Sequence, residues 1–354
     1  MSKPIDFAYK RSAILEDLHI QKYAPVFGNW DESQLLIREL RQLFESSKLN
    51  SHIKTIIAVG SIGRMEASLT LSDADLIIIL DDTIDLGSSL AKSIYQECWH
   101  NIEEAVKVKK PKVRGMFSKA TNELEIFNEE ALGPFEHFFD YSKRLIILME
   151  GQPLYRDDNF LSLRNKSVDF YAKNYVSIDP TKEWAFLLND LIRFFRTGLI
   201  NYRWDLEKEI KKWPLRNIKM SYSRLLMYSG LLLLLGESSK ERQDKVGFLK
   251  AKLNLTPFER VAYVYEANLD WNFHRIAASY AIFLSQINDA DVRESLENSE
   301  GSNQLPYESY VKRYDNPQFA MLKNNSDAFI AELLRFILAR RGSWSERFYE
   351  YLIF

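Results

Sequence analysis

The sequence predicts an α+β fold, with a small mixed sheet and helices in an N-terminal domain and an all-α C-terminal domain. Two short β-branched or aliphatic runs, each bounded by turn residues, lie within the first 80 residues. After about residue 140, nearly every segment carries apolar residues at helical spacing. The stretch 142–158 holds a glycine and a proline and separates the two patterns. We therefore predict domains at 1–150 and 151–354.

Strands and helices alternate in the N-terminal part. Residues 33–47 and 88–106 carry apolar side chains at helical spacing, the second range after a serine cap. Residues 52–61, "HIKTIIAVGS", and 73–80, "DADLIIIL", predict strands, and the first of these runs into a Gly-Ser turn. A further strand is predicted at 123–127, "ELEIF".

The C-terminal part opens with a strong helix signal, because Asp179 can cap a helix whose first position is Pro180. The most apolar run, 225–235, is shorter than the roughly 20 residues that cross a bilayer, so it predicts a buried helix and no membrane span.

Composition narrows the classes of partner and location. The 354 residues carry a net charge of −2, so no global basic field attracts nucleic acid, and a long nucleic acid is disfavoured as a substrate. The basic run 107–114 is interpreted as an exposed turn and edge strand. Cys98 is the only cysteine, which excludes an intrachain disulfide and fits a cytoplasmic location. The mixed, charged N-terminus predicts no signal peptide.

Two aspartates begin the second predicted strand. Asp73 and Asp75 are two residues apart, so their carboxylates emerge on one face. Two neighbouring anions repel each other, and a divalent cation that prefers oxygen ligands relieves this repulsion. The pair therefore predicts a metal site.

A Gly-Ser pair closes the preceding strand, eleven residues before the aspartates. Gly60 allows backbone N–H groups to approach an anion, and the Ser61 hydroxyl adds a donor. A short helix opening at about Ile62 would add a favourable dipole, and Arg64 could make charge-assisted contacts to phosphate. Together with the metal site, this turn suits metal-assisted attack on a nucleoside triphosphate.

The stretch "GSIGRMEASLTLSDADLIII" resembles the nucleotidyltransferase motif of the DNA polymerase β superfamily. Within it, the stretch is most similar to the bacterial uridylyltransferase-like branch, which reads G-S-x-G-R-x-E and then S-D-x-D. The matching residues are Gly60, Ser61, Gly63, Arg64, Glu66, Ser72, Asp73 and Asp75. The motif covers about 20 residues, and with the flanking elements the resemblance extends over roughly the first 140. It implies an enzyme that transfers a nucleoside monophosphate from an NTP to a hydroxyl acceptor and releases pyrophosphate.

The resemblance also implies a ligand set. Two Mg²⁺ ions, or Mn²⁺, would be held by Asp73, Asp75 and a third carboxylate on a neighbouring strand. Glu125 is our candidate for that third acid and for the base that deprotonates the acceptor, with Glu123 as its competitor, although aspartate is commoner in this role. The family pattern assigns nucleotide contacts to Gly60, Ser61, Gly63, Arg64 and Ser72. Asp81 and Asp82 are interpreted as turn residues, and are next in line if neither glutamate serves.

Basic residues of the helical part could complete the nucleotide site. Four polar residues share one face of the helix expected from about 181: Asn189, Arg193, Arg196 and Arg203. Arg216 and Lys219 form a second pair at i, i+3 spacing. We predict that Arg193, Arg196 and Lys219 bind the triphosphate or an acidic acceptor; the alternative is a set of solvated faces and surface salt bridges.

Several alternatives stay open from the sequence. The acceptor could be a small molecule, a protein side chain or a tRNA end, and neither the NTP nor a homo-oligomeric state is specified. A cyclic-oligonucleotide synthase of the same superfamily shares the Gly-Ser and D-x-D core. A protein of another class, which binds nucleotide without turnover as an antitoxin or sensor does, is the main rival.

Overall fold

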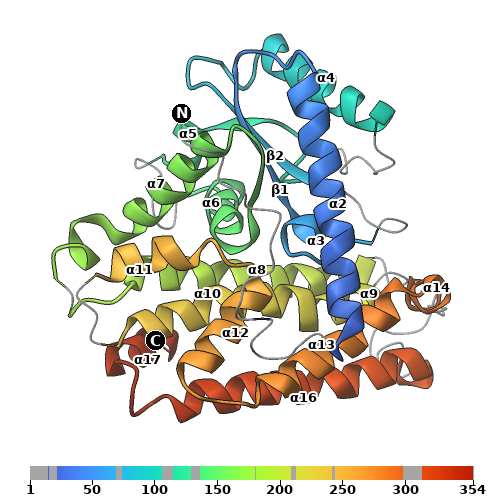
Figure 1. Ribbon diagram of the computed structural model, residues 1–354, viewed down its shortest axis with the longest axis vertical. Helices are drawn as coiled ribbons and strands as arrows, with labels where there is room; N and C mark the ends of the chain where they lie inside the picture. Colours follow the sequence, from blue (N-terminus) through green and yellow to red (C-terminus); the bar gives the residue numbers. More distant parts are fainter. Residues whose placement is uncertain are drawn as a thin grey trace. The chain divides into compact units, whose positions relative to one another are not determined.

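The computed structural model describes residues 15, 22–68, 74–105, 115–128, 136–179, 181–208, 213–240, 244–297 and 313–353 (Figure 1). Contacts divide the chain into two compact units. The first is built mainly from Gly28–Lys182 and Gln243–Thr256, and the second mainly from Glu183–Arg242 and Pro257–Phe354. The first unit thus continues beyond residue 150; the functional domain assignment at that residue stays a prediction.

The first unit contains a four-stranded mixed sheet in the order β3-β2-β1-β4. Its strands are β1 (Ile53–Val59), β2 (Asp75–Leu80), β3 (Thr121–Asn122) and β4 (Gln152–Tyr155). Strand β1 is antiparallel to both β2 and β4, whereas β2 and β3 are parallel. The helices of this unit are α2 (Ala24–Ser46, from Gly28 on), α3 (Gly60–Gly63), α4 (Ser89–Ala105), α5 (Glu123–Ile126), α6 (Phe138–Glu150), α7 (Asp157–Val176) and α11 (Lys245–Lys252). The coarse α+β prediction is therefore confirmed.

The two central strands form the core of this sheet. Their register runs from Ile53 opposite Leu80 to Val59 opposite Asp75. Nearly every side chain of β1 and β2 is buried, which explains why both strands read as almost continuous aliphatic runs. Both strands were predicted from the sequence and are confirmed, as are helices α2 and α4.

The predicted strand at 123–127 is wrong, because the chain turns into the short helix α5 directly after β3. The Asn122 side chain caps this helix by accepting a hydrogen bond from the Glu125 N–H at 2.9 Å. The Asp82 carboxylate accepts two more, from the N–H groups of Glu123 (3.0 Å) and Leu124 (3.3 Å). These side-chain acceptors satisfy the N–H groups that a helix start leaves open.

Three predicted helix starts are also displaced. Helix α2 begins at Ala24, nine residues before the predicted range 33–47. Helix α3 opens at Gly60 instead of about Ile62. The helix expected at 179–180 begins only at Ala185; Pro180 lies outside the described residues. The Asp179 carboxylate accepts instead from the N–H and the hydroxyl of Thr181, at 2.9 and 2.7 Å, and so closes a local turn.

The second unit consists of helices in its described part. They are α8 (Ala185–Lys208), α9 (Trp213–Lys219), the π-helix η5 (Met220–Arg224), α10 (Leu225–Ser238), α12 (Pro257–Ala267), α13 (Phe273–Asn288), α14 (Ala290–Glu297), the 3₁₀ turn η6 (Arg313–Asp315), α16 (Pro317–Ala339) and α17 (Glu346–Ile353). Helix α10 contains the apolar run 225–235 and is almost wholly buried, as predicted. No helix among the residues the structure describes combines the length and apolar character needed to cross a membrane.

Candidate functional site

The Gly60 turn and the first residue of β2 meet at one end of the sheet. The pairing of Val59 with Asp75 brings the carboxylate onto the turn. Gly60 has a φ of +67°, and a Cβ at this position would lie 2.6 Å from Oδ2 of Asp75. A side chain at residue 60 is therefore excluded both by backbone strain and by the carboxylate itself.

Polar groups at this turn are partly exposed. Asp75 and Ser61 are both half-buried. The Ser61 carbonyl accepts a hydrogen bond from the Glu66 N–H at 2.8 Å, and its hydroxyl makes no hydrogen bond to any described residue. The Ser61 hydroxyl thus lies just beyond the end of β1 and the Asp75 carboxylate at the start of β2, and their roles toward a ligand stay predictions.

Arg64 has partners that the sequence did not reveal. Its guanidinium donates from Nε to Glu66 at 3.0 Å and from Nη1 to Glu150 at 2.5 Å. The residue is only 7% exposed. The structure therefore shows Arg64 as an internal ion-pair partner, and its predicted contact to phosphate stays a prediction.

Glu150, the last residue of α6, was missed from the sequence. Its Oε1 accepts a hydrogen bond from the Gly60 N–H at 2.8 Å, and a Cβ on Gly63 would lie 2.3 Å from its backbone carbonyl. The signal that could have found it is an acid at the end of an apolar helix, "LIILMEG", where the helix dipole disfavours a negative charge.

The structure does not bring Glu125 to Asp75. Strand β3 pairs Thr121 with Ile79 and Asn122 with Leu80, so it lies beside the far end of β2. The rise of about 3.3 Å per residue separates the two ends of β2 by about 17 Å. Helix α5 follows β3, and Figure 1 shows α3 and α5 at opposite ends of the strands.

Cations surround the Glu125 carboxylate instead. It lies 2.9 Å from Nζ of both Lys119 and Lys143, and it accepts a hydrogen bond from the Thr121 hydroxyl. Burial alone would raise the pKa of the Glu125 carboxyl, but the charge of Lys143 and these hydrogen bonds outweigh burial and lower it to about 2. The group is therefore a firmly ionised ion-pair partner.

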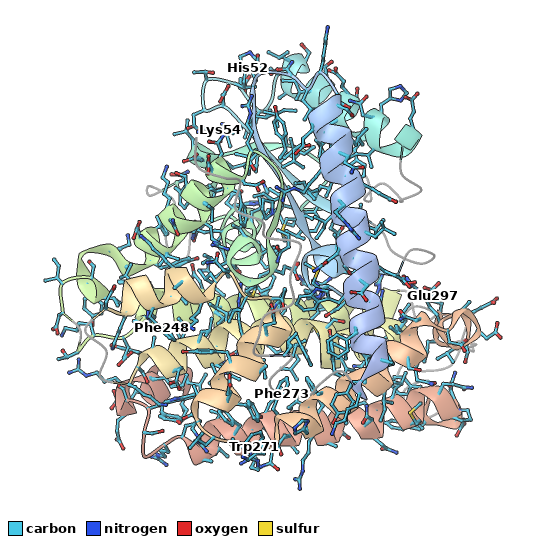
Figure 2. The ribbon with its side chains drawn as sticks, viewed as in Figure 1. His52, Lys54, Phe248, Trp271, Phe273 and Glu297 are labelled. Atoms are coloured by element: carbon cyan, nitrogen blue, oxygen red, sulfur yellow. The ribbon has the colours of Figure 1, made fainter. Side chains whose placement is uncertain are left out.

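Glu123 is held in a similar way. Its carboxylate lies 2.9 Å from Nζ of Lys54 and 2.7 Å from Nζ of Lys166. Burial would raise the pKa of Glu123, yet the hydrogen bonds and charges of the two lysines lower it. Figure 2 shows Lys54 and His52 at this end of the sheet, where His52 Nδ1 lies 3.3 Å from Asp81.

The residues predicted to bind the metal and the nucleotide are only partly described. Ser72 and Asp73 lie outside the described residues. Within the part of the chain that the structure describes, no three histidine, cysteine, aspartate or glutamate side chains form a group that could hold a metal. The metal-ligand role of Asp75 stays a prediction, and Glu125 and Glu123 follow the strand at the other end of β2.

The predicted basic residues of the helical part belong to the second unit. Arg193 Nη2 lies 3.7 Å from the Asp190 carboxylate, one helical turn away. Burial raises the pKa of Tyr228 to about 12, and the charge of nearby Arg196 opposes this rise. Lys219 is half-buried and ends α9, directly before the π-helix η5. The side chain of Arg203 lies outside the described residues.

Comparison of the chain with models of known protein families, with curated proteins and with solved structures found no match.

Proposed function

We propose that this protein is a nucleotidyltransferase, which moves a nucleoside monophosphate from an NTP to a hydroxyl acceptor and releases pyrophosphate. The observation that carries the proposal is the placement of the Asp75 carboxylate directly on the Gly60-Ser61 turn by the Val59–Asp75 pairing. Gly60 and Asp75 are fifteen residues apart in the sequence, and the pairing of β1 with β2 brings them together.

The residues of the turn have separable tasks in this proposal. The left-handed Gly60 lets the chain turn beneath the carboxylate, and the Ser61 hydroxyl donates to a phosphate oxygen. Asp73 and Asp75 would hold Mg²⁺. When bound, this ion would neutralise part of the phosphate charge. Arg193, Arg196 and Lys219 are proposed to contact the triphosphate.

The test is a labelling experiment that does not require the acceptor to be known. The purified chain is incubated with each α-labelled NTP, Mg²⁺ and a cell extract, and both pyrophosphate release and the labelled product are measured. One NTP is expected to label a product in a reaction that EDTA stops. A product that carries the nucleotide would support the proposal, and absence of pyrophosphate release with all four NTPs would contradict it.

A pair of matched variants assigns the reaction to the site. Asp75→Asn removes the charge beside Gly60, and Asp81→Asn makes the same change just beyond the other end of β2. We expect Asp75→Asn to abolish pyrophosphate release while the fold is kept, and Asp81→Asn to retain it. Equal activity in wild type and Asp75→Asn would remove the carboxylate from the reaction.

A second function is favoured by one observation, namely that neither of the two proposed third acids, Glu123 and Glu125, lies at the Asp75 end of β2 in the described part of the chain. Residues 105–122, which lead into the strand beside β2, contain no aspartate or glutamate, and the acids of α5 face lysines. A protein that binds NTP without turnover would need no base at this position. Saturable, Mg²⁺-dependent NTP binding without pyrophosphate release would select this second function.

A further inference from the structure

We infer that Glu150 is a positioning residue, which holds the Gly60-Ser61 turn in place beneath Asp75. The inference rests on the proposed function for its consequence, nucleotide binding, but its structural part stands on contacts alone. Glu150 is 2% exposed and follows the apolar core of α6. It has no part in binding or chemistry, because both of its carboxylate oxygens are engaged inside the protein.

Three groups of Glu150 meet three residues of the sequence motif. Oε1 accepts from the Gly60 N–H, Oε2 accepts from Arg64, and the backbone carbonyl packs where a side chain on Gly63 would stand. The motif residues Gly63 and Arg64 thus contact Glu150. Both residues therefore have a structural part in the turn.

The position of Glu150 is unfavourable for a carboxylate unless the group has partners. A carboxylate at the C-terminal end of a helix is disfavoured by the helix dipole, and its burial adds a desolvation penalty. The hydrogen bond from Gly60 and the ion pair with Arg64 offset both. Arg64 also pairs with Glu66, so it would keep this carboxylate if Glu150 were lost. The Gly60 N–H, in contrast, would lose its acceptor.

Two substitutions at Glu150 separate these contacts. Glu150→Gln keeps a carbonyl oxygen that can accept from Gly60 but loses the charge that pairs with Arg64. Glu150→Ala removes both contacts. We therefore expect a graded effect on the turn, larger for alanine and partly rescued by glutamine.

Glu136→Gln is the matched control. Glu136 lies 2.8 Å from Nη2 of Arg144 in the same unit, and the two side chains are 4% and 0% exposed. The substitution Glu136→Gln breaks a buried carboxylate–arginine pair and leaves the contacts of the Gly60 turn unchanged. Any effect shared by Glu136→Gln and Glu150→Gln reflects the loss of a buried ion pair, and the difference between them reports on the turn.

The experiment measures amide hydrogen exchange and NTP binding in the full chain. In Glu150→Ala we expect exchange at residues 60–66 to rise at least tenfold above that of Glu136→Gln, with similar exchange in β2 in both variants. With Mg²⁺ and each of the four NTPs, we expect the Kd to rise about tenfold or more in Glu150→Ala, less in Glu150→Gln, and little in Glu136→Gln.

The outcomes distinguish this inference from the proposed function. If the wild type binds no NTP, the proposed function fails, and the exchange of residues 60–66 alone decides the role of Glu150. Unchanged exchange in both Glu150 variants would overturn the inference. It would also be overturned if NTP affinity fell in all three variants in proportion to their loss of melting temperature, because Glu150 would then act on stability only.

Discussion

Replacing Glu125 by glutamine tests whether this residue stabilises the fold, as its contacts indicate. The substitution keeps the size of the side chain and removes the charge that faces Lys119 and Lys143. The pKa of Glu125 falls from its usual 4.5 to about 2, which corresponds to about 3.5 kcal/mol at about 1.4 kcal/mol per pKa unit. Burial lowers the pKa of Lys143 more than Glu125 raises it, so the lysine offsets part of this gain. We therefore expect Glu125→Gln to cost about 1.5–3 kcal/mol at pH 7, the range for hydrogen bonds to charged groups.

The sign of the pH dependence follows from the lowered pKa. A carboxyl group whose pKa is lower in the folded state stabilises the fold above its unfolded pKa, and loses that contribution as the pH falls through the folded value. The difference between wild type and Glu125→Gln should therefore be constant above about pH 5.5 and shrink between pH 4.5 and about 2. The chain has two compact units, so unfolding is best followed locally, by amide exchange in β2 and α6.

Glu123→Gln is the control, with the same change two residues away on the same short helix. Its partners Lys54 and Lys166 are more exposed than Lys143, so we expect a loss below about 1 kcal/mol. The reasoning would be refuted if Glu125→Gln left the stability unchanged at pH 7. It would also be refuted if the loss were as large at pH 3 as at pH 7.

The remaining predictions concern the backbone and the second unit. Gly60→Ala forces a Cβ against Asp75 and a strained φ, so we expect loss of NTP binding in titrations and a destabilisation of about 1–3 kcal/mol in urea unfolding. Leu269 has a φ of +53° and is 82% exposed, so Leu269→Gly should raise stability by about 0.5–1 kcal/mol in thermal unfolding, whereas Leu269→Ala should give no gain. The double variant Arg193→Ala/Arg196→Ala should weaken NTP affinity more than it lowers the melting temperature. If the two arginines formed only surface salt bridges, the change would be less than about 1 kcal/mol in either assay. Unchanged NTP affinity would show that these arginines do not bind the nucleotide.

The sequence predicted best where local pattern and tertiary burial agree. Strands β1 and β2 are aliphatic because nearly every side chain is buried, so their pattern alone identified them. Strand β4 was missed because its sequence, "QPLY", is short and contains Pro153, which an edge strand tolerates. Helix α5 was missed because Asp82, forty-one residues before Glu123, accepts hydrogen bonds from two N–H groups at its N-terminus. Such a contact leaves no trace in a local window of sequence.

The candidate site shows the same division between local and distant information. The contact between Gly60 and Asp75 could be anticipated, because a turn and a following strand that pairs back bring them together. The separation of Glu125 from Asp75 could not, because it depends on which end of β2 the two-residue strand β3 pairs with.

The motif contains partly exposed residues and buried residues, and a comparison of sequences does not distinguish the two kinds. Ser61 and Asp75 are partly exposed, whereas Gly63 and Arg64 are buried against Glu150. A match to the motif therefore reports on the structure of the turn as well as on its chemistry. A protein that binds nucleotide without turnover would still need Gly63 and Arg64 to fold the turn. Retention of those two residues cannot decide between transfer and binding alone. The partly exposed residues Ser61 and Asp75 can distinguish the two functions, so Asp75→Asn, and not Arg64→Ala, is the variant that tests the reaction.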